Sequence, residues 1–285
     1  MAAAIPGDAR ETFVLQVNAL AHAPLGKLWL GCLAKKERKL LALLEKAGID
    51  PLVNVDRLAL IPDGEGLAVA SGFFAGANPL TLVESLPDAE PHITVRPHGA
   101  DATLFTTRLC FFECWPMELA RWGNATLAFG EPKRVRAFVD RLQERSSEPP
   151  LALPENAFAA DIFAVTGAAR LASWLDLDDR VLDRWLSELP ARAELRVDAM
   201  RDVRATARVT VEDPAAAGDL AELFDSAVAA AASKALVAGD LARVELLGRL
   251  AVIRGQGEFT LSLDLPLEAL ERQFQGCRRE EDGWW

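Results

Sequence analysis

The sequence predicts an α+β fold of two tandem related units, each an antiparallel sheet with helices packed on one face. Three patterns indicate this fold: strict apolar–polar alternation typical of hairpins, helices that begin at a proline, and one proline-rich break near the middle. With 285 residues, 51% of them hydrophobic, the chain is long enough for two domains that each bury a core.

The break comprises residues 144–157. It contains three prolines and follows neither the period of a strand nor that of a helix, which is typical of a linker. We therefore assign residues 1–143 to a first unit, 158–275 to a second unit and 276–285 to a C-terminal tail.

The second unit carries the clearest pattern. Residues 193–199 and 203–211 alternate apolar side chains with charged residues or threonine around a turn, which predicts a hairpin with one buried and one solvated face. The expected elements around this hairpin are a strand at 158–165, helical spacing at 168–189, a helix at 214–238, a second hairpin at 250–253 and 259–265, and a helix at 266–274.

The first unit repeats this order of elements. We expect a strand at 13–17, a helix at 24–46, a hairpin at 55–61 and 67–74, a short helix from 79, a hairpin at 93–96 and 103–107, a strand at 125–130 and a helix at 132–142. Residues 109–124 have no counterpart in the second unit and are the most aromatic segment of the chain, so they are interpreted as an insert.

A resemblance accompanies this organisation. The run Leu43-Leu-Glu-Lys-Ala-Gly-Ile-Asp-Pro-Leu-Val-Asn-Val-Asp-Arg-Leu-Ala-Leu60, followed by a Gly-rich turn and Ser71-Gly72-Phe73-Phe74, resembles a loose group of uncharacterised two-domain α+β proteins. These proteins come from high-GC bacteria of the myxobacterial kind, and many are exported or lipid-anchored. The similarity spans most of residues 12–270. It implies the fold and suggests the cell envelope, and it carries no catalytic residue over to this chain.

Charge and hydropathy exclude two classes of partner. The net charge of −11 argues against nucleic acid, whose phosphates require a dense basic surface. No stretch approaches the roughly 18 uninterrupted apolar residues of a membrane span, so we expect no transmembrane segment. The N-terminus as written lacks the features of a signal peptide. We therefore expect a cytoplasmic protein, or one of the periplasm or cell envelope if the N-terminus is processed.

Known catalytic motifs are missing from the sequence. It contains no HExxH, GxSxG, P-loop or strand–GxGxxG–helix pattern, so we expect no catalytic residues and no cofactor. His92, His98, Cys110 and Cys114 lie within 23 residues and are of types that bind zinc. If residues 93–107 form a hairpin, however, His98 and Cys110 lie on the order of 20 Å apart. We therefore predict no metal site.

The cysteines could also form a redox pair. On one strand, Cys110 and Cys114 would place their Cα atoms about 13 Å apart, beyond the roughly 7 Å limit for a disulfide. Only a looped or helical segment between them would bring them together, so we expect buried thiols. The pattern leaves the redox states of Cys32 and Cys277 open.

Aromatic side chains supply the candidate site. Large aromatics dominate binding surfaces and also fill cores, so the aromatic segment either contacts a partner or ligand or extends the first unit's core. The terminal tryptophans either dock on a partner or fold back on their own domain. The candidate surface comprises Phe111, Phe112, Trp115, Met117, Trp122, Trp284 and Trp285.

These patterns lead to three hypotheses for function. The first is a non-catalytic interaction or scaffold protein whose protein partner the sequence does not identify, with the cell envelope as its suggested location. The second is a protein that binds a small apolar ligand at a site between the two units, walled by residues 109–124. The third is an enzyme without a recognisable motif.

Overall fold

The computed structural model describes the chain apart from residues 1–4, 6–8, 63–65, 88, 111–113, 147–152, 154 and 275–285. The chain divides into two compact units. Unit 1 comprises residues 1–21 and 33–158, and unit 2 comprises residues 22–32 and 159–285. The division after residue 158 lies at the end of the expected linker, whereas residues 22–32 group with unit 2 although they precede most of unit 1.

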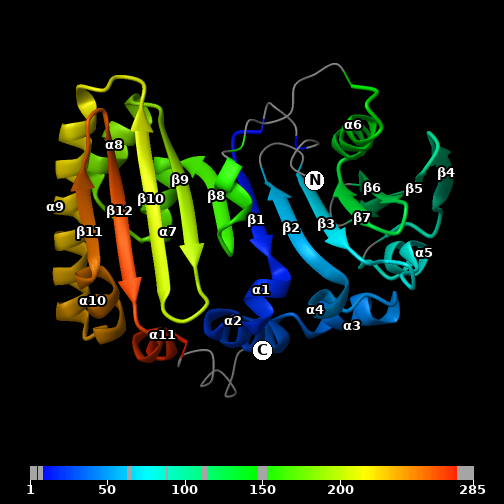
Figure 1. Cartoon of the computed structure of the whole chain (residues 1–285), viewed down its shortest axis with the longest axis horizontal. Coiled ribbons are helices and arrows are strands. Elements are labelled where there is room, and N and C mark those ends of the chain that lie inside the picture. The colour runs from blue at the N-terminus through cyan, green and yellow to red at the C-terminus, as the bar shows by residue number, and fades with distance from the viewer. Residues whose placement is uncertain are drawn as a thin grey trace. The chain divides into compact units, whose positions relative to one another are not determined.

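Unit 1 is built on an antiparallel sheet with the strand order β1-β2-β3-β7-β6-β5-β4 (Figure 1). The strands are β1 (Thr12–Gln16), β2 (Val55–Ile61), β3 (Leu67–Gly72), β4 (Thr94–His98), β5 (Ala102–Cys110), β6 (Cys114–Trp122) and β7 (Thr126–Gly130). The helices in this part of the chain are α1 (Val17–His22), α2 (Pro24–Lys36), α3 (Arg38–Lys46), α4 (Pro51–Asn54), α5 (Pro79–Glu84) and α6 (Pro132–Leu142), and a short 3-10 turn, η2 (Glu155–Phe158), ends the unit.

Three helices of unit 1 begin in the same way, with a capping side chain followed by proline. Asp50 caps α4, Asn78 caps α5 and Glu131 caps α6, each accepting a hydrogen bond from a backbone N–H of the first turn. A proline at the first helical position has no N–H to leave unsatisfied, so this combination sets a sharp helix start. The single helix expected over residues 24–46 is instead two, α2 and α3, separated at Glu37.

The predicted insert at residues 109–124 is wrong. Its described residues form the end of β5, all of β6 and the first two residues of the turn that follows. Strand β6 lies inside the sheet between β5 and β7. Leu119 and Ala120 are both buried, although neighbouring side chains on a strand point to opposite faces. A strand that is covered on both faces loses its apolar–polar alternation, which explains why the sequence pattern did not reveal it.

The helices of unit 1 cover both faces of its sheet, so the expectation of helices on one face is wrong here. Leu119 packs in a cluster with Val83 of α5 and Phe74. The adjacent Glu118 points to the other face, where it meets Arg136 of α6. Figure 1 shows α6 well separated from α3, α4 and α5.

Unit 2 follows the predicted α+β layer arrangement. Its antiparallel strands have the order β8-β9-β10-β12-β11, with β8 (Ile162–Gly167), β9 (Ala191–Asp198), β10 (Val203–Val211), β11 (Leu250–Arg254) and β12 (Glu258–Leu265). The helices are α7 (Ala168–Trp174), α8 (Arg180–Glu188), α9 (Ala216–Ala238), α10 (Leu241–Gly248) and α11 (Leu267–Gln273). In Figure 1, α7 and α8 lie behind the strands and α9 runs along the left edge beside β11. The apolar side chains of these helices share one core cluster with the inner face of the sheet.

The other face of this sheet carries the polar half of the alternation, which confirms the predicted hairpin. Ala207 and Val209 of β10 are buried in the core. Arg204 and Arg208 on the same strand are exposed, and each pairs with an acidic residue of β12, Asp264 and Glu258 respectively. Such exposed pairs contribute little stability, typically below about 1 kcal/mol each.

The strands of the two units do not have the same order, so the structure does not confirm the expected duplication. Both begin with a strand, a helical segment and a hairpin, and in both the last strand lies beside the third. Unit 1 contains two further strands that have no counterpart among the described residues of unit 2.

A buried ionic cluster joins β6 to α6 in unit 1. The side chain of Glu118 is 0% exposed and accepts two hydrogen bonds of 2.9 Å from Arg136, one to each carboxylate oxygen. Thr106 donates at 2.7 Å and Arg96 approaches to 3.4 Å. The hydrogen bond that Arg136 donates to Glu118 raises the pKa of the arginine above its ordinary value. The carboxylate therefore depends mainly on Arg136 for its charge balance.

This dependence predicts unequal costs for the two arginines. Arg136→Met leaves a fully buried carboxylate without its two-pronged partner and should lower the free energy of unfolding by about 3 kcal/mol. Arg96→Met removes one long contact from a half-exposed side chain and should cost about 1 kcal/mol or less. Chemical denaturation of both variants measures the difference, and equal costs would contradict the assigned role of Arg136.

Candidate functional site

A disulfide closes the β5–β6 hairpin. Cys110 is the last residue of β5, Cys114 is the first of β6, and the two are cross-strand partners with Cα atoms 4.0 Å apart. The expected buried thiols are therefore wrong. The 13 Å separation applies to two residues on one strand, whereas these two lie on neighbouring antiparallel strands.

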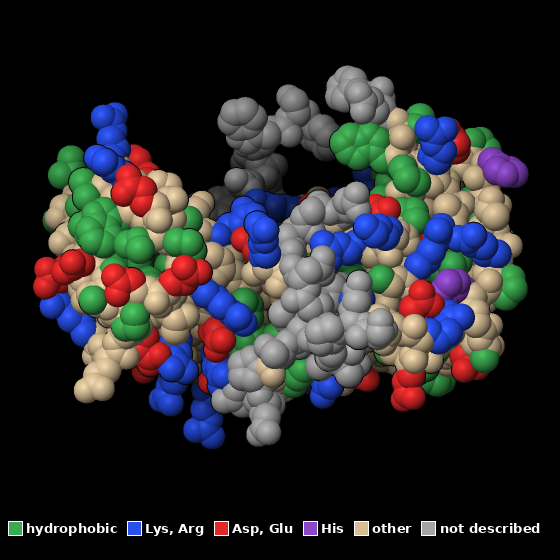
Figure 2. Space-filling view, turned by 90° about the horizontal axis from the view of Figure 1, so that it is seen from above, with side chains coloured by type: hydrophobic (Ala, Val, Ile, Leu, Met, Phe, Trp, Pro, Cys, Tyr) green, Lys and Arg blue, Asp and Glu red, His purple; other side chains and the backbone are tan. Residues whose placement is uncertain are grey.

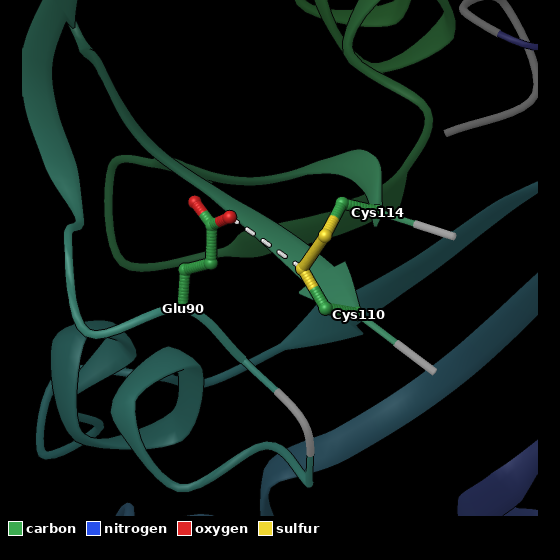
Figure 3. Close-up of side chains that lie close together, drawn as sticks. All are labelled: Glu90, Cys110 and Cys114. Carbon is green, nitrogen blue, oxygen red and sulfur yellow. Dashed lines mark hydrogen bonds between the residues drawn. A yellow bond between two sulfur atoms is a disulfide. The ribbon is translucent and has the colours of Figure 1, made fainter. Parts of the chain in front are cut away.

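A carboxylate lies beside the disulfide, as Figure 3 shows, and the guanidinium of Arg108 lies close to that carboxylate. Oε1 of Glu90 is 3.5 Å from Sγ of Cys110 and 3.5 Å from Nη1 of Arg108. Arg108 also donates to the carbonyl oxygen of Cys114. A disulfide sulfur carries no hydrogen, so the dashed contact in Figure 3 becomes a hydrogen bond only when Cys110 is a thiol.

Backbone contacts hold Glu90 in this position. Its N–H donates to the carbonyl oxygen of Arg108 at 2.8 Å, and its own carbonyl oxygen accepts from the Thr107 hydroxyl at 3.2 Å. The preceding residue, Ala89, forms a bridge with Leu109. Residues 89 and 90 thus follow the outer side of β5, and the carboxylate is placed by the sheet rather than by a free loop.

The aromatic candidates that the structure describes do not form one surface. Trp115 is 60% exposed beside the disulfide, and Met117 is partly buried. Trp122 is at the far end of β6, about 23 Å from Trp115 at the rise of a strand. Its indole N–H is buried, has no acceptor among the described residues, and borders a separate recess of about 310 Å³. Phe111, Phe112, Trp284 and Trp285 lie outside the described residues.

His98 and the acidic segment 176–183 have ordinary contacts, and His92, the other histidine considered with the cysteines, is exposed. His98 Nε2 is 3.0 Å from Asp140, which also binds Arg145. In the acidic segment 176–183, Asp179 caps α8, and Lys234 lowers the pKa of Asp178 chiefly through its hydrogen bond. Within the described chain, the group of side chains close enough to hold a metal is Glu90, Cys110 and Cys114.

An open recess of about 720 Å³ lies in unit 1, away from this hairpin. Residues from β1, α1, β2, β3 and β7 meet there, and none comes from residues 109–124. Its polar lining contrasts with the apolar site expected from sequence and comprises Gln16, Asn18, Asp56, Arg57, Ser71 and Thr126.

The charged surface is mixed. On the face shown in Figure 2, Lys and Arg side chains are interspersed with Asp and Glu over both units. No helix in the described part of the chain is long and apolar enough to cross a membrane. Comparisons with protein-family models, curated proteins and solved structures give no match to this chain.

Removing the disulfide should destabilise the protein. A cross-link that closes a loop of about five residues contributes about 2 kcal/mol by restricting the unfolded chain. The Cys110→Ser, Cys114→Ser double variant should lose about this much free energy of unfolding in denaturant without reductant. Unchanged stability would show that the bond does not constrain the hairpin.

Proposed function

We propose that this protein is a non-catalytic interaction protein and that the disulfide end of the β5–β6 hairpin is its docking surface. The observation that supports this most is Trp115, a large aromatic that is 60% exposed on a strand inside a sheet. A tryptophan that contributed mainly to the core would be covered. An exposed one presents apolar area that a partner can bury.

The surroundings of Trp115 suit a docking role. The disulfide at Cys114, the adjacent residue, fixes the start of β6, so little ordering is needed when a partner binds. Arg108 and Glu90 are partly exposed next to it, and such charges at the rim of an interface favour specificity and rapid association.

The non-catalytic part of the proposal is supported by how the reactive side chains are used. Cys110 and Cys114 are bonded to each other, and His98 is paired with Asp140. Neither cysteine is therefore paired with a histidine, as it would be if the cysteine were a nucleophile and the histidine its general base.

The disulfide also supports a location in the cell envelope. Disulfides persist in oxidising compartments and are rare in a reducing cytosol. This agrees with the location that the resemblance suggests, and with a protein that meets its partner outside the cytosol.

Trp115→Ala tests the docking surface directly. Because the side chain is mostly exposed, melting should change little, with a loss of about 1 kcal/mol or less, whereas a core tryptophan would cost about 3–5 kcal/mol. The wild-type protein and the variant are each used as bait in an extract of the native host, and the captured proteins are identified by mass spectrometry. The variant should lose the partners that the wild-type protein captures.

Phe73→Ala is the matched control, since Phe73 is 66% exposed elsewhere in unit 1. It should retain the partners. The proposal is wrong if Trp115→Ala captures the same proteins as wild type, or if both variants lose them equally.

A second function is favoured by the polar recess. Asp56 and Arg57 place opposite charges beside the amides of Gln16 and Asn18, a set suited to a small polar ligand with both donors and acceptors. Arg57 is held in place by a 3.0 Å hydrogen bond to Gln16 and by stacking on Phe158.

If this recess binds a ligand, a member of a panel of small zwitterionic compounds should raise the melting temperature of the wild-type protein. Asp56→Asn, which keeps the shape of the recess and removes its negative charge, should reduce that increase. No stabilisation by any zwitterion, or equal stabilisation of both proteins, would count against a ligand site here.

A further inference from the structure

We infer that the reduced form of the hairpin end binds a thiophilic divalent cation such as Zn²⁺ through Cys110, Cys114 and Glu90. The two sulfur atoms and a carboxylate oxygen all lie within 4.8 Å of one another. Thiolate and carboxylate are established zinc ligands. This revises the sequence-based expectation of no metal, which considered the two cysteines together with His92 and His98.

One distance already matches the geometry of a bound cation. With Zn–S near 2.3 Å and Zn–O near 2.0 Å, a tetrahedral site separates a sulfur from an oxygen ligand by about 3.5 Å. The distance from Cys110 Sγ to Glu90 Oε1 is 3.5 Å. Two of the three ligands are therefore in place before any metal arrives, held by the bridge of Ala89 to Leu109.

The third ligand requires only a local movement. In the same geometry two thiolates lie about 3.8 Å apart, so the sulfurs must separate once the bond between them is reduced. Cys114 is exposed and can rotate its side chain without disturbing the core. Three protein ligands leave a fourth position for water, as in zinc sites that are open to solvent.

The charges of the site balance when the metal is bound. Two thiolates and the carboxylate carry three negative charges, and a divalent cation neutralises two of them. Arg108, with its guanidinium 3.5 Å from Glu90, supplies the remaining positive charge. The arginine thus stabilises the loaded site without occupying a ligand position.

The redox step links the two states of the hairpin. A dithiol reductant gives two electrons and two protons to the Cys110–Cys114 bond, which becomes two thiols, while the reductant closes to its own cyclic disulfide. The cation then displaces both thiol protons. In the oxidised hairpin the sulfurs are bonded to each other and offer no thiolate. Metal binding and the disulfide therefore exclude each other.

Titration of the full chain with Co²⁺ tests this inference. The protein is first reduced by a phosphine under anaerobic conditions. The phosphine is oxidised to a phosphine oxide, whose oxygen atom comes from water, as the disulfide becomes two thiols. Unlike a thiol reductant, the phosphine adds no thiol that would compete for the metal. The reduced protein should bind one Co²⁺ at this hairpin, with the charge-transfer and d–d absorption of a tetrahedral thiolate site, and Zn²⁺ should displace it. The oxidised protein should give no such spectrum.

Variants locate the site. Cys110→Ser, Cys114→Ser keeps Cys32 and Cys277 and should lose this Co²⁺ spectrum, while Glu90→Gln should weaken binding by about tenfold or more. Glu84→Gln, on an exposed carboxylate of α5, is the matched control and should bind as wild type does. Binding by the double-serine variant equal to wild type, or no binding by the reduced wild-type protein, would overturn the inference. Trp115→Ala should still bind Co²⁺, so this test is independent of the docking surface.

Discussion

The register between β5 and β6 determines how the rest of unit 1 is arranged. Pairing of Ala102 with Trp122 at one end places Cys110 opposite Cys114 at the other. Because strand side chains alternate between faces, the same register directs Leu119 into the apolar cluster beneath α5 and Glu118 toward α6. A shift by one residue would bury Leu119 against the charged partners of Glu118 and separate the two cysteines.

Different interactions hold the middle of β6 and the end of the hairpin that carries the disulfide. Toward the middle of β6, apolar packing and the Glu118–Arg136 pair make a change of register costly. At the disulfide end the strand leaves the core, and Trp115 and Cys114 are exposed. There the disulfide replaces packing as the constraint, which allows reactive and apolar groups to be presented to solvent in a fixed arrangement. The docking surface and the proposed metal site both depend on this division.

Much of the fold could be predicted because its signals are local. The alternation in β9 and β10, and the cap-and-proline starts of α5 and α6, are written in residues close together in sequence. Strand β6 was not predicted from the sequence, because burial on both faces and Pro116 remove the alternation that marks a strand. Without this alternation, residues 109–124 were interpreted as an insert. The remaining elements of the two halves then matched in order, which favoured the prediction of a duplication.

The candidate site was harder to predict because it depends on that one pairing. A Cys-x₃-Cys spacing allows a disulfide only if the chain reverses direction between the cysteines. The sequence pattern was interpreted with both cysteines on one strand, which would hold them too far apart. Glu90 gives no signal of its own, since it is brought to Cys110 by the bridge between Ala89 and Leu109, 20 residues apart in sequence. Trp115 was recognised as a candidate from its residue type, but only the fold distinguishes an exposed aromatic from a buried one.

The central claim is that Cys110 and Cys114 are joined in the protein as the cell makes it. The most direct test is peptide mapping of protein isolated from its native host with free thiols blocked at the moment of lysis. We predict that the peptide spanning residues 110–114 carries no blocking group and is lighter by two hydrogens than the reduced peptide. A peptide with both cysteines blocked would contradict the account, because the hairpin end would then lack the constraint that fixes Trp115.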